Sequence, residues 1–172
     1  MTGHDEVHSL SANYPQADVR FWMGFGDHYI NVFTVLNNLG LLSEQPVLTA
    51  EGQEVVPLKV VKAVLPDPSS LAPEYTGKTC IGDLVKGVKD GQEVEVFVYN
   101  VADHKEAFNE VGSQGISYTA GVPPVAAAML IANGTWDTGT MVNVEELDPK
   151  PFLTILDKIG LPTRVRLGNT DK

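Results

Sequence analysis

The fold is decided by two strand-forming runs and the turn between them: Lys78-Thr-Cys-Ile-Gly-Asp-Leu-Val-Lys-Gly-Val88, Lys89-Asp-Gly-Gln92 and Glu93-Val-Glu-Val-Phe-Val-Tyr-Asn-Val101. Both runs are rich in β-branched and aromatic residues, which fit a pleated, half-buried surface. Asp90-Gly91 is a strong hairpin signal because these residue types tolerate the positive φ that a tight turn requires. This stretch therefore predicts an antiparallel pair of strands.

Further strands and helices are expected on both sides of this hairpin. In chain order, the patterns predict a strand at 19–26, helices at 29–39 and 57–65, a loop at 67–77, helices at 105–111, 123–132 and 151–159, and a strand at 163–167. Asp27 is the expected N-cap of the first helix, and Gly40 its C-cap. This irregular alternation around an antiparallel hairpin favours an α+β (mixed α/β) domain, with a largely antiparallel sheet flanked by helices, over a doubly wound parallel sheet.

Length and composition indicate a folded globule. The chain has 172 residues, of which 43% are hydrophobic and 20% charged, so one domain with a sizeable core is expected. With 12 Lys and Arg against 22 Asp and Glu, the net charge of -10 disfavours nucleic acid and anionic membranes as partners. The single cysteine, Cys80, excludes an internal disulfide, and we expect it to lie in an apolar-alternating strand rather than act as a nucleophile.

The compartment is expected to be the cytoplasm. A lone cysteine suits a reducing environment. No apolar run approaches the length that a membrane span needs, and the first residues lack a basic region followed by an apolar one.

The stretch from Tyr99 to Pro123 contains the candidate site. Asp103 and His104 follow a predicted strand, at the position where a sheet commonly opens into a crevice. The residues after the next helix have little bulk and offer backbone and hydroxyl donors, which would let another molecule approach the main chain closely. They are Gly112, Ser113, Gln114, Gly115, Ser117 and Thr119. We interpret this stretch as one wall of a ligand cleft.

Two side-chain pairs are open to more than one interpretation. Asp103 and His104 would suit an acid/base pair, but Asp103 would equally suit the N-cap of the following helix, with His104 in its first turn. Arg20, expected to be buried in an aromatic strand beside Trp22, would suit a clamp for a carboxylate or a structural ion pair. Trp22 and Trp136 would also suit core or interface anchors.

Other common site signatures are missing from the sequence. His4 and His8 are four residues apart but lack a third anchor, so no metal site is predicted. No Gly-x-Ser-x-Gly is present, which leaves covalent acyl chemistry without support. Neither dinucleotide nor phosphate-loop fingerprint occurs, so no nucleotide-binding motif is found in this chain.

Several spaced motifs together resemble one known family. They are Arg20-Phe-Trp-Met-Gly-Phe-Gly26, Lys62-Ala-Val-Leu-Pro-Asp-Pro68, Gly77-Lys-Thr-Cys-Ile-Gly82, Tyr99-Asn-Val-Ala-Asp-His104, Glu110-Val-Gly-Ser-Gln114, Ile116-Ser-Tyr-Thr-Ala-Gly-Val-Pro123 and Glu145-Glu-Leu-Asp-Pro149. The combination, over about residues 4–162, resembles the C-terminal half of the saccharopine dehydrogenase-like family, most closely its carboxynorspermidine (carboxyspermidine) synthase members. Ala120 departs from the threonine that the family pattern favours.

The resemblance implies that substrate binding and cofactor binding belong to two different domains. Residues 1–172 would form a single C-terminal domain that binds substrate and makes a homodimer, while an N-terminal Rossmann domain, absent here, would bind NADPH or NADH. The implied reaction is a reductive condensation of aspartate β-semialdehyde with a diamine, and the isolated chain is expected to bind no cofactor and to be inactive. Two alternatives stay open: a saccharopine dehydrogenase of lysine metabolism, and a non-catalytic oligomerisation module.

The resemblance also implies roles for site residues. His104, with Asp103, would move the proton as the carbinolamine collapses. Arg20 would hold the semialdehyde carboxylate, and Asp103 or Glu110 the amine. The full set of implied substrate-binding residues is Arg20, Trp22, Glu110, Gln114, Ser117, Tyr118, Thr119, His4 and Glu6.

Overall fold

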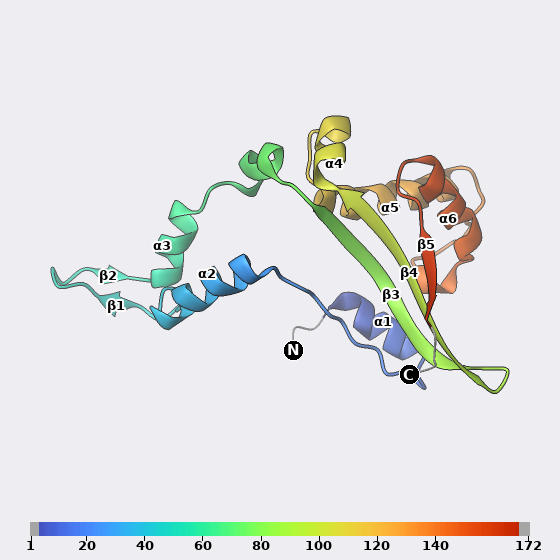
Figure 1. Cartoon of the computed structure of the whole chain (residues 1–172), viewed down its shortest axis with the longest axis horizontal. Helices are drawn as coiled ribbons and strands as arrows, with labels where there is room; N and C mark the ends of the chain where they lie inside the picture. Colours follow the sequence, from blue (N-terminus) through green and yellow to red (C-terminus); the bar gives the residue numbers. More distant parts are fainter. Residues whose placement is uncertain (1–3, 169–172) are drawn as a thin grey trace. The chain divides into compact units, whose positions relative to one another are not determined.

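The structure, a computed structural model, describes residues 4–168 of the chain (Figure 1). The chain divides into two compact units, Met1–Asp67 and Pro68–Lys172. Each unit combines helices with antiparallel strands, which confirms the predicted mixed α/β class. That residues 1–172 act as a single domain stays a prediction.

The first unit contains helices and a small two-stranded sheet. Its elements are α1 (Asp5–Asn13), α2 (Asp27–Asn38), β1 (Val47–Leu48), β2 (Glu54–Val55) and α3 (Pro57–Val64). Helices α2 and α3 confirm two predictions, and Pro57 begins α3 because a missing N–H costs nothing at the first helical position. The N-cap position of α2 is Gly26 rather than Asp27, so the predicted cap was wrong by one residue.

The predicted strand at 19–26 was wrong. These residues form no regular element, and no strand among residues 4–168 pairs with them. Strand propensity reports how well a side chain fits a paired, half-buried surface, so it has no effect where a partner strand is missing. Trp22 is therefore 81% exposed instead of packed in a core.

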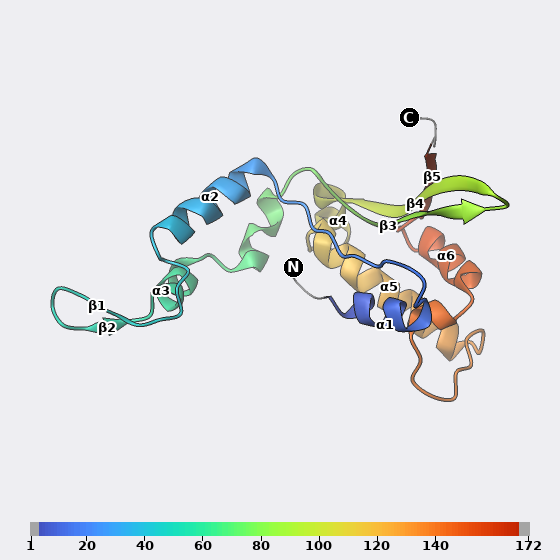
Figure 2. The same ribbon diagram turned by 90° about the horizontal axis from the view of Figure 1, so that it is seen from below.

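The second unit is built on a three-stranded sheet and the helices beside it. Its elements are η1 (Pro68–Glu74), β3 (Lys78–Lys89), β4 (Gln92–Asp103), α4 (His104–Val111), α5 (Gly115–Ala132), η2 (Val144–Glu146), α6 (Pro149–Lys158) and β5 (Arg164–Gly168). The strand order is β3-β4-β5, and both pairings are antiparallel. Figure 2 shows α5 and α6 on the same side of this sheet.

The predicted hairpin is confirmed in position and in turn chemistry. Lys89 pairs with Gln92, and the two residues between them, Asp90 and Gly91, have φ values of 53° and 79°. Positive φ at both positions is the geometry that Asp-Gly favours. The final strand, β5, and the last helix, α6, also lie close to their predicted ranges.

The core of the second unit joins β4 to its three α-helices. Its buried members are Ala102, Ala107, Tyr118, Ala126, Leu156 and Leu161. The side chain of Asn100 in β4 donates to the carbonyls of Leu161 and Pro162, over 3.1 and 3.0 Å. The connection between α6 and β5 is thereby fixed to the central strand.

Helix α5 differs from its prediction. It was expected to begin at Pro123, but one continuous helix runs from Gly115 and includes Pro123 and Pro124. Proline lacks a helical N–H and usually interrupts a helix. Here Tyr118, Ala126 and Leu130 are buried along one side of the helix, and the free energy gained from this packing outweighs the cost of two prolines inside the helix.

The length of α5 corrects a second expectation. By length and composition alone, its 18 residues are long and apolar enough to cross a membrane. The expectation that the chain contains no apolar run of this length was therefore wrong. The helix packs against β3, β4, α4 and α6, and 28% of it is buried. Cys80 lies in β3 as expected, but it is exposed.

Candidate functional site

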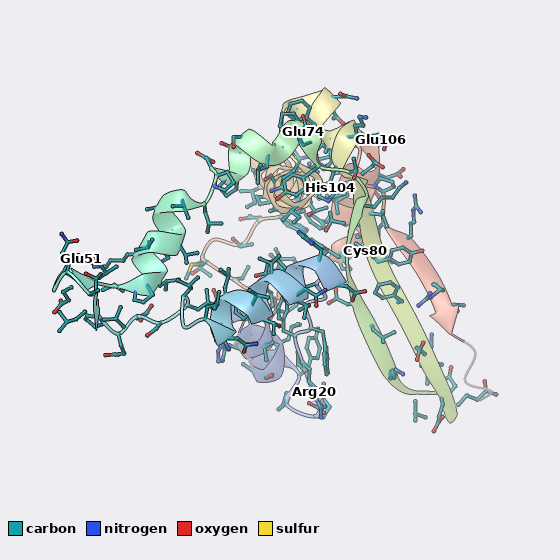
Figure 3. The ribbon with its side chains drawn as sticks, turned by 60° about the vertical axis from the view of Figure 1, so that its left-hand side comes forward. Arg20, Glu51, Glu74, Cys80, His104 and Glu106 are labelled. Atoms are coloured by element: carbon teal, nitrogen blue, oxygen red, sulfur yellow. The ribbon has the colours of Figure 1, made fainter. Side chains whose placement is uncertain are left out.

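His104 is a buried histidine at the junction of β4 and α4 (Figure 3). Its side chain is only 8% exposed, and its Nδ1 accepts a hydrogen bond of 3.1 Å from the backbone N–H of Gly115. Its ring stacks on Tyr75 at 5.4 Å between centroids. Because Nδ1 is an acceptor here, the ring proton is on Nε2. Both contacts fix the orientation of the imidazole.

Asp103 is the N-cap of α4. Its carboxylate accepts hydrogen bonds from the backbone N–H groups of Lys105, at 2.9 Å, and Glu106, at 3.2 Å. Both hydrogen bonds lower the pKa of Asp103, and the bond from the Glu106 N–H has the larger effect. Lys78, whose Nζ lies 3.9 Å from the carboxylate, lowers this pKa by a smaller amount. The capping interpretation of Asp103 is confirmed, while a catalytic role for Asp103 or His104 stays a prediction.

A hollow of about 150 Å³ lies between η1 and the start of α5. Its lining residues are Pro68, Ser69, Ala72, Gly112, Ser113, Gln114 and Ser117. Two of the predicted substrate-binding residues, Gln114 and Ser117, are thus brought to one hollow. Within residues 4–168, the Oε1 atom of Gln114 is buried without a hydrogen-bond donor. A buried acceptor of this kind is costly unless something supplies a donor.

The small polar run has a different structure from the one expected. It was predicted to be an open wall of a cleft, but Gly115 to Thr119 form the first turns of α5. Of this run, only Gly112, Ser113, Gln114 and Ser117 border the hollow. The wall is therefore a turn and a helix start rather than a loop.

Tyr118 links three helices instead of bordering this hollow. Its hydroxyl lies 3.2 Å from both carboxylate oxygens of Glu110 in α4, and 3.3 Å from the carbonyl of Ile159 after α6. Burial raises the pKa of Tyr118, and the neighbouring Glu110 raises it further. Thr119 is buried, and its hydroxyl donates to the carbonyl of Ile116 over 3.0 Å. Substrate binding by Glu110, Tyr118 or Thr119 stays a prediction.

The other predicted substrate-binding residues belong to the first unit. Arg20 was expected to be buried in a strand, but it is exposed in an irregular segment, where its Nε donates to Asp18 over 3.1 Å. This pair raises the pKa of Arg20 and lowers the pKa of Asp18. Arg20 thus forms the ion pair that was the alternative interpretation, and its role as a carboxylate clamp stays a prediction.

His4 and Glu6 lie at the start of α1. The His4 ring bonds to the Glu6 carboxylate and stacks on Phe21 at 4.1 Å. The pKa of Glu6 is lowered, first by its own backbone N–H and then by His4. The two residues form a local pair within the first unit, and their binding of substrate is not tested by this geometry.

The contacts of Gly115 and Tyr75 with His104 were missed from the sequence. A Cβ on Gly115 would lie 3.3 Å from the Nδ1 of His104 and 3.2 Å from the carbonyl of Ala102, so a side chain there would crowd the imidazole. Glycine within a polar run can signal a close approach of backbone to another group. Nothing local in the sequence connects Tyr75 with His104, because their contact is tertiary.

Comparison with known proteins identifies the family. The saccharopine dehydrogenase C-terminal domain matches residues 1–161 of the chain. The chain belongs to this family. A carboxynorspermidine synthase of Vibrio alginolyticus is 51% identical over 163 residues, and one of Vibrio cholerae is 49% identical over 158. A carboxyaminopropylagmatine dehydrogenase of Synechocystis sp. is 48% identical over 160 residues.

The alignments with these three relatives cover nearly all of this chain but less than half of each relative. The alignments include 95%, 92% and 92% of the chain, against 39%, 38% and 40% of the respective relatives. This saccharopine dehydrogenase C-terminal domain thus spans about two fifths of the length of these relatives. The activity of a whole relative is a property of a much longer polypeptide.

The described residues do not form a dinucleotide-binding fold. Dinucleotide folds use parallel strands joined through helices, with a glycine-rich turn against the pyrophosphate. The strand pairs within residues 4–168 are all antiparallel, and the sequence has no Gly-x-Gly-x-x-Gly.

Proposed function

We propose that this chain is the substrate-binding and dimerisation part of an NAD(P)H-dependent oxidoreductase that makes carboxynorspermidine or a related carboxylated polyamine. The reaction would be the reductive condensation of aspartate β-semialdehyde with a diamine. The observation that carries the proposal is the identity of 51% to a carboxynorspermidine synthase over 95% of the chain. A separate part of the enzyme would bind the cofactor, and the compartment would be the cytoplasm.

The hollow beside α5 supports a role in holding the reactants. Gln114 borders it together with Ser113 and Ser117, and among residues 4–168 its buried amide oxygen has no hydrogen-bond donor. An ammonium or amine group in the hollow would supply that donor once the Gln114 amide turns toward it, and serine hydroxyls both donate and accept hydrogen bonds. The hollow would position a polar, amine-bearing reactant, which lowers the entropic barrier to condensation.

His104 would act from a fixed orientation. Its Nδ1 accepts from the Gly115 N–H, so its Nε2–H would donate a hydrogen bond to the departing oxygen of the carbinolamine, and a proton would reach the ring only at Nδ1 after the Gly115 bond breaks. Asp103, held ionised at the start of α4 by its lowered pKa, would favour a cationic amine nearby. These roles require only hydrogen bonding and positioning by residues of this chain.

The test is an assay of the complete enzyme with competing substrate pairs. NADPH oxidation would be measured with aspartate semialdehyde plus 1,3-diaminopropane, with aspartate semialdehyde plus agmatine, and with aminoadipate semialdehyde plus glutamate. The proposal predicts turnover with an aspartate semialdehyde pair. Turnover with the glutamate pair alone would establish the saccharopine dehydrogenase alternative, and no turnover with any pair would favour the non-catalytic module.

A further inference from the structure

The first unit contains a hollow of about 280 Å³ that the proposed function does not use. Its lining residues are Glu44, Val56, Leu58, Lys59 and Lys62. It forms where the segment after α2 meets the start of α3: the N–H of Leu58 donates to the carbonyl of Ser43 over 3.1 Å. Figure 1 shows α2, the β1-β2 pair and α3 as consecutive elements of this unit.

Two lysines, Lys59 and Lys62, are among the residues that line this hollow. They are three residues apart in α3, so they lie on the same face of the helix. Pro57 and Val61 are the buried residues of α3, and they leave the lysines at the surface. Lys62 also begins one of the sequence motifs, Lys62 to Pro68, to which no role has been assigned so far.

The two lysines lie in a unit whose charged residues are mostly acidic. Residues 1–67 include eight Asp and Glu but only three Lys and Arg: Arg20, Lys59 and Lys62. Arg20 is bound to Asp18. Across the described range 4–168, Lys59 and Lys62 take part in none of the ion pairs. Among residues 4–67, the two lysines that are in none of these ion pairs thus border the same hollow.

We propose that this hollow binds the phosphate group of a small organic phosphate, with Lys59 and Lys62 as its ligands. A phosphate monoester carries close to two negative charges, which match two ammonium groups, whereas a single carboxylate would leave one of them uncompensated. Val56 and Leu58 would contact the carbon part of the ligand. Glu44 would accept a hydrogen bond from a hydroxyl group of the ligand, and the attraction of the two lysines must outweigh the repulsion between its carboxylate and the phosphate.

The binding test uses phenyl phosphate as the probe and the 172-residue chain as the protein. Titration followed by ³¹P and ¹⁵N NMR should give saturable shifts, with phenyl phosphate binding more tightly than inorganic phosphate or benzoate. Replacing both lysines, Lys59→Gln with Lys62→Gln, should weaken phenyl phosphate binding by at least about tenfold. The matched control, Lys89→Gln with Lys158→Gln, removes the same charge from exposed positions of the second unit and should bind as the unaltered chain does.

Three results would overturn this proposal. They are the absence of saturable binding to the unaltered chain, equal weakening in the two double variants, and benzoate binding as tight as that of phenyl phosphate. Thermal melts would verify that each variant is folded, and the single variants Lys59→Gln and Lys62→Gln would replace the double variant if it were not. The test does not depend on the oxidoreductase reaction, because it measures only the binding of phenyl phosphate to the chain.

Discussion

At the scale of single residues, His104 has a structural task whether or not it also transfers protons. Its Nδ1 satisfies the buried N–H of Gly115. Replacing His104 with Ala would leave that N–H without an acceptor, and a buried unsatisfied group costs roughly 1–3 kcal/mol of unfolding free energy. Urea unfolding of His104→Ala should show this loss, whereas Lys105→Ala, at an exposed neighbouring position, should change little. Equal stability of His104→Ala and the unaltered chain would contradict this assignment.

Asp103 gives a pH-dependent prediction. The pKa of Asp103 is lower in the folded chain than in the unfolded chain, so its ionised form stabilises the fold at pH values above the ordinary aspartate pKa of about 3.9. That contribution is lost as the pH falls through the lower folded-state pKa. Asp103→Asn should therefore melt below the unaltered chain at pH 7, and the difference should shrink in acid below about pH 4. A difference in melting temperature that is independent of pH would argue against the charged cap.

Residue-level interpretation of the sequence succeeded where the interaction is local. The capping alternative for Asp103 depends on a carboxylate and the N–H groups two and three residues later, which the sequence displays directly. The burial of Arg20 and Trp22 was wrong because it depended on a strand that has no partner among residues 4–168. The contact between Tyr75 and His104 is tertiary and left no local signal.

At the scale of elements, two glycines of β3 should respond differently to alanine. A Cβ on Gly82 would collide with the carbonyl oxygen of Val98 and lie 2.6 Å from the Cα of Tyr99, and these backbone atoms of β4 cannot move aside cheaply. A Cβ on Gly87 would meet open space. Gly82→Ala should lower the free energy of unfolding by about 1–3 kcal/mol, while Gly87→Ala should be within about 0.5 kcal/mol of the unaltered chain. Denaturant unfolding measures both free energies. Equal losses of unfolding free energy in Gly82→Ala and Gly87→Ala would contradict the β3-β4 register.

The success of prediction differed between these elements. The hairpin was predictable because its strands and its Asp-Gly turn are encoded within one continuous stretch. The start of α5 was not, because glycines and two prolines oppose helix formation locally, and the contacts that stabilise the helix come from β4 and α6. Tertiary packing overrides propensity at such positions.

At the scale of the whole molecule, the homodimer is a prediction. The strand register places Val85, Val165 and Leu167 on one face of the β3-β4-β5 sheet, and all three are exposed. Exposed apolar side chains gathered on a sheet are favourably covered by another surface. Multi-angle light scattering of the 172-residue chain at micromolar concentration should give the mass of two copies. The mass of one copy, 18.6 kDa, would contradict an interface formed by this chain alone.

The central claim is that the hollow beside α5 holds a reactant of the oxidoreductase. The most direct measurement is steady-state NADPH oxidation by the complete enzyme carrying Gln114→Ala, with Gln92→Ala in the β3-β4 turn as the matched control. Loss of the Gln114 amide should raise the KM for the amine or the semialdehyde by about tenfold, with a smaller change in kcat and no change in the control. An unchanged KM for both reactants in Gln114→Ala would contradict the account.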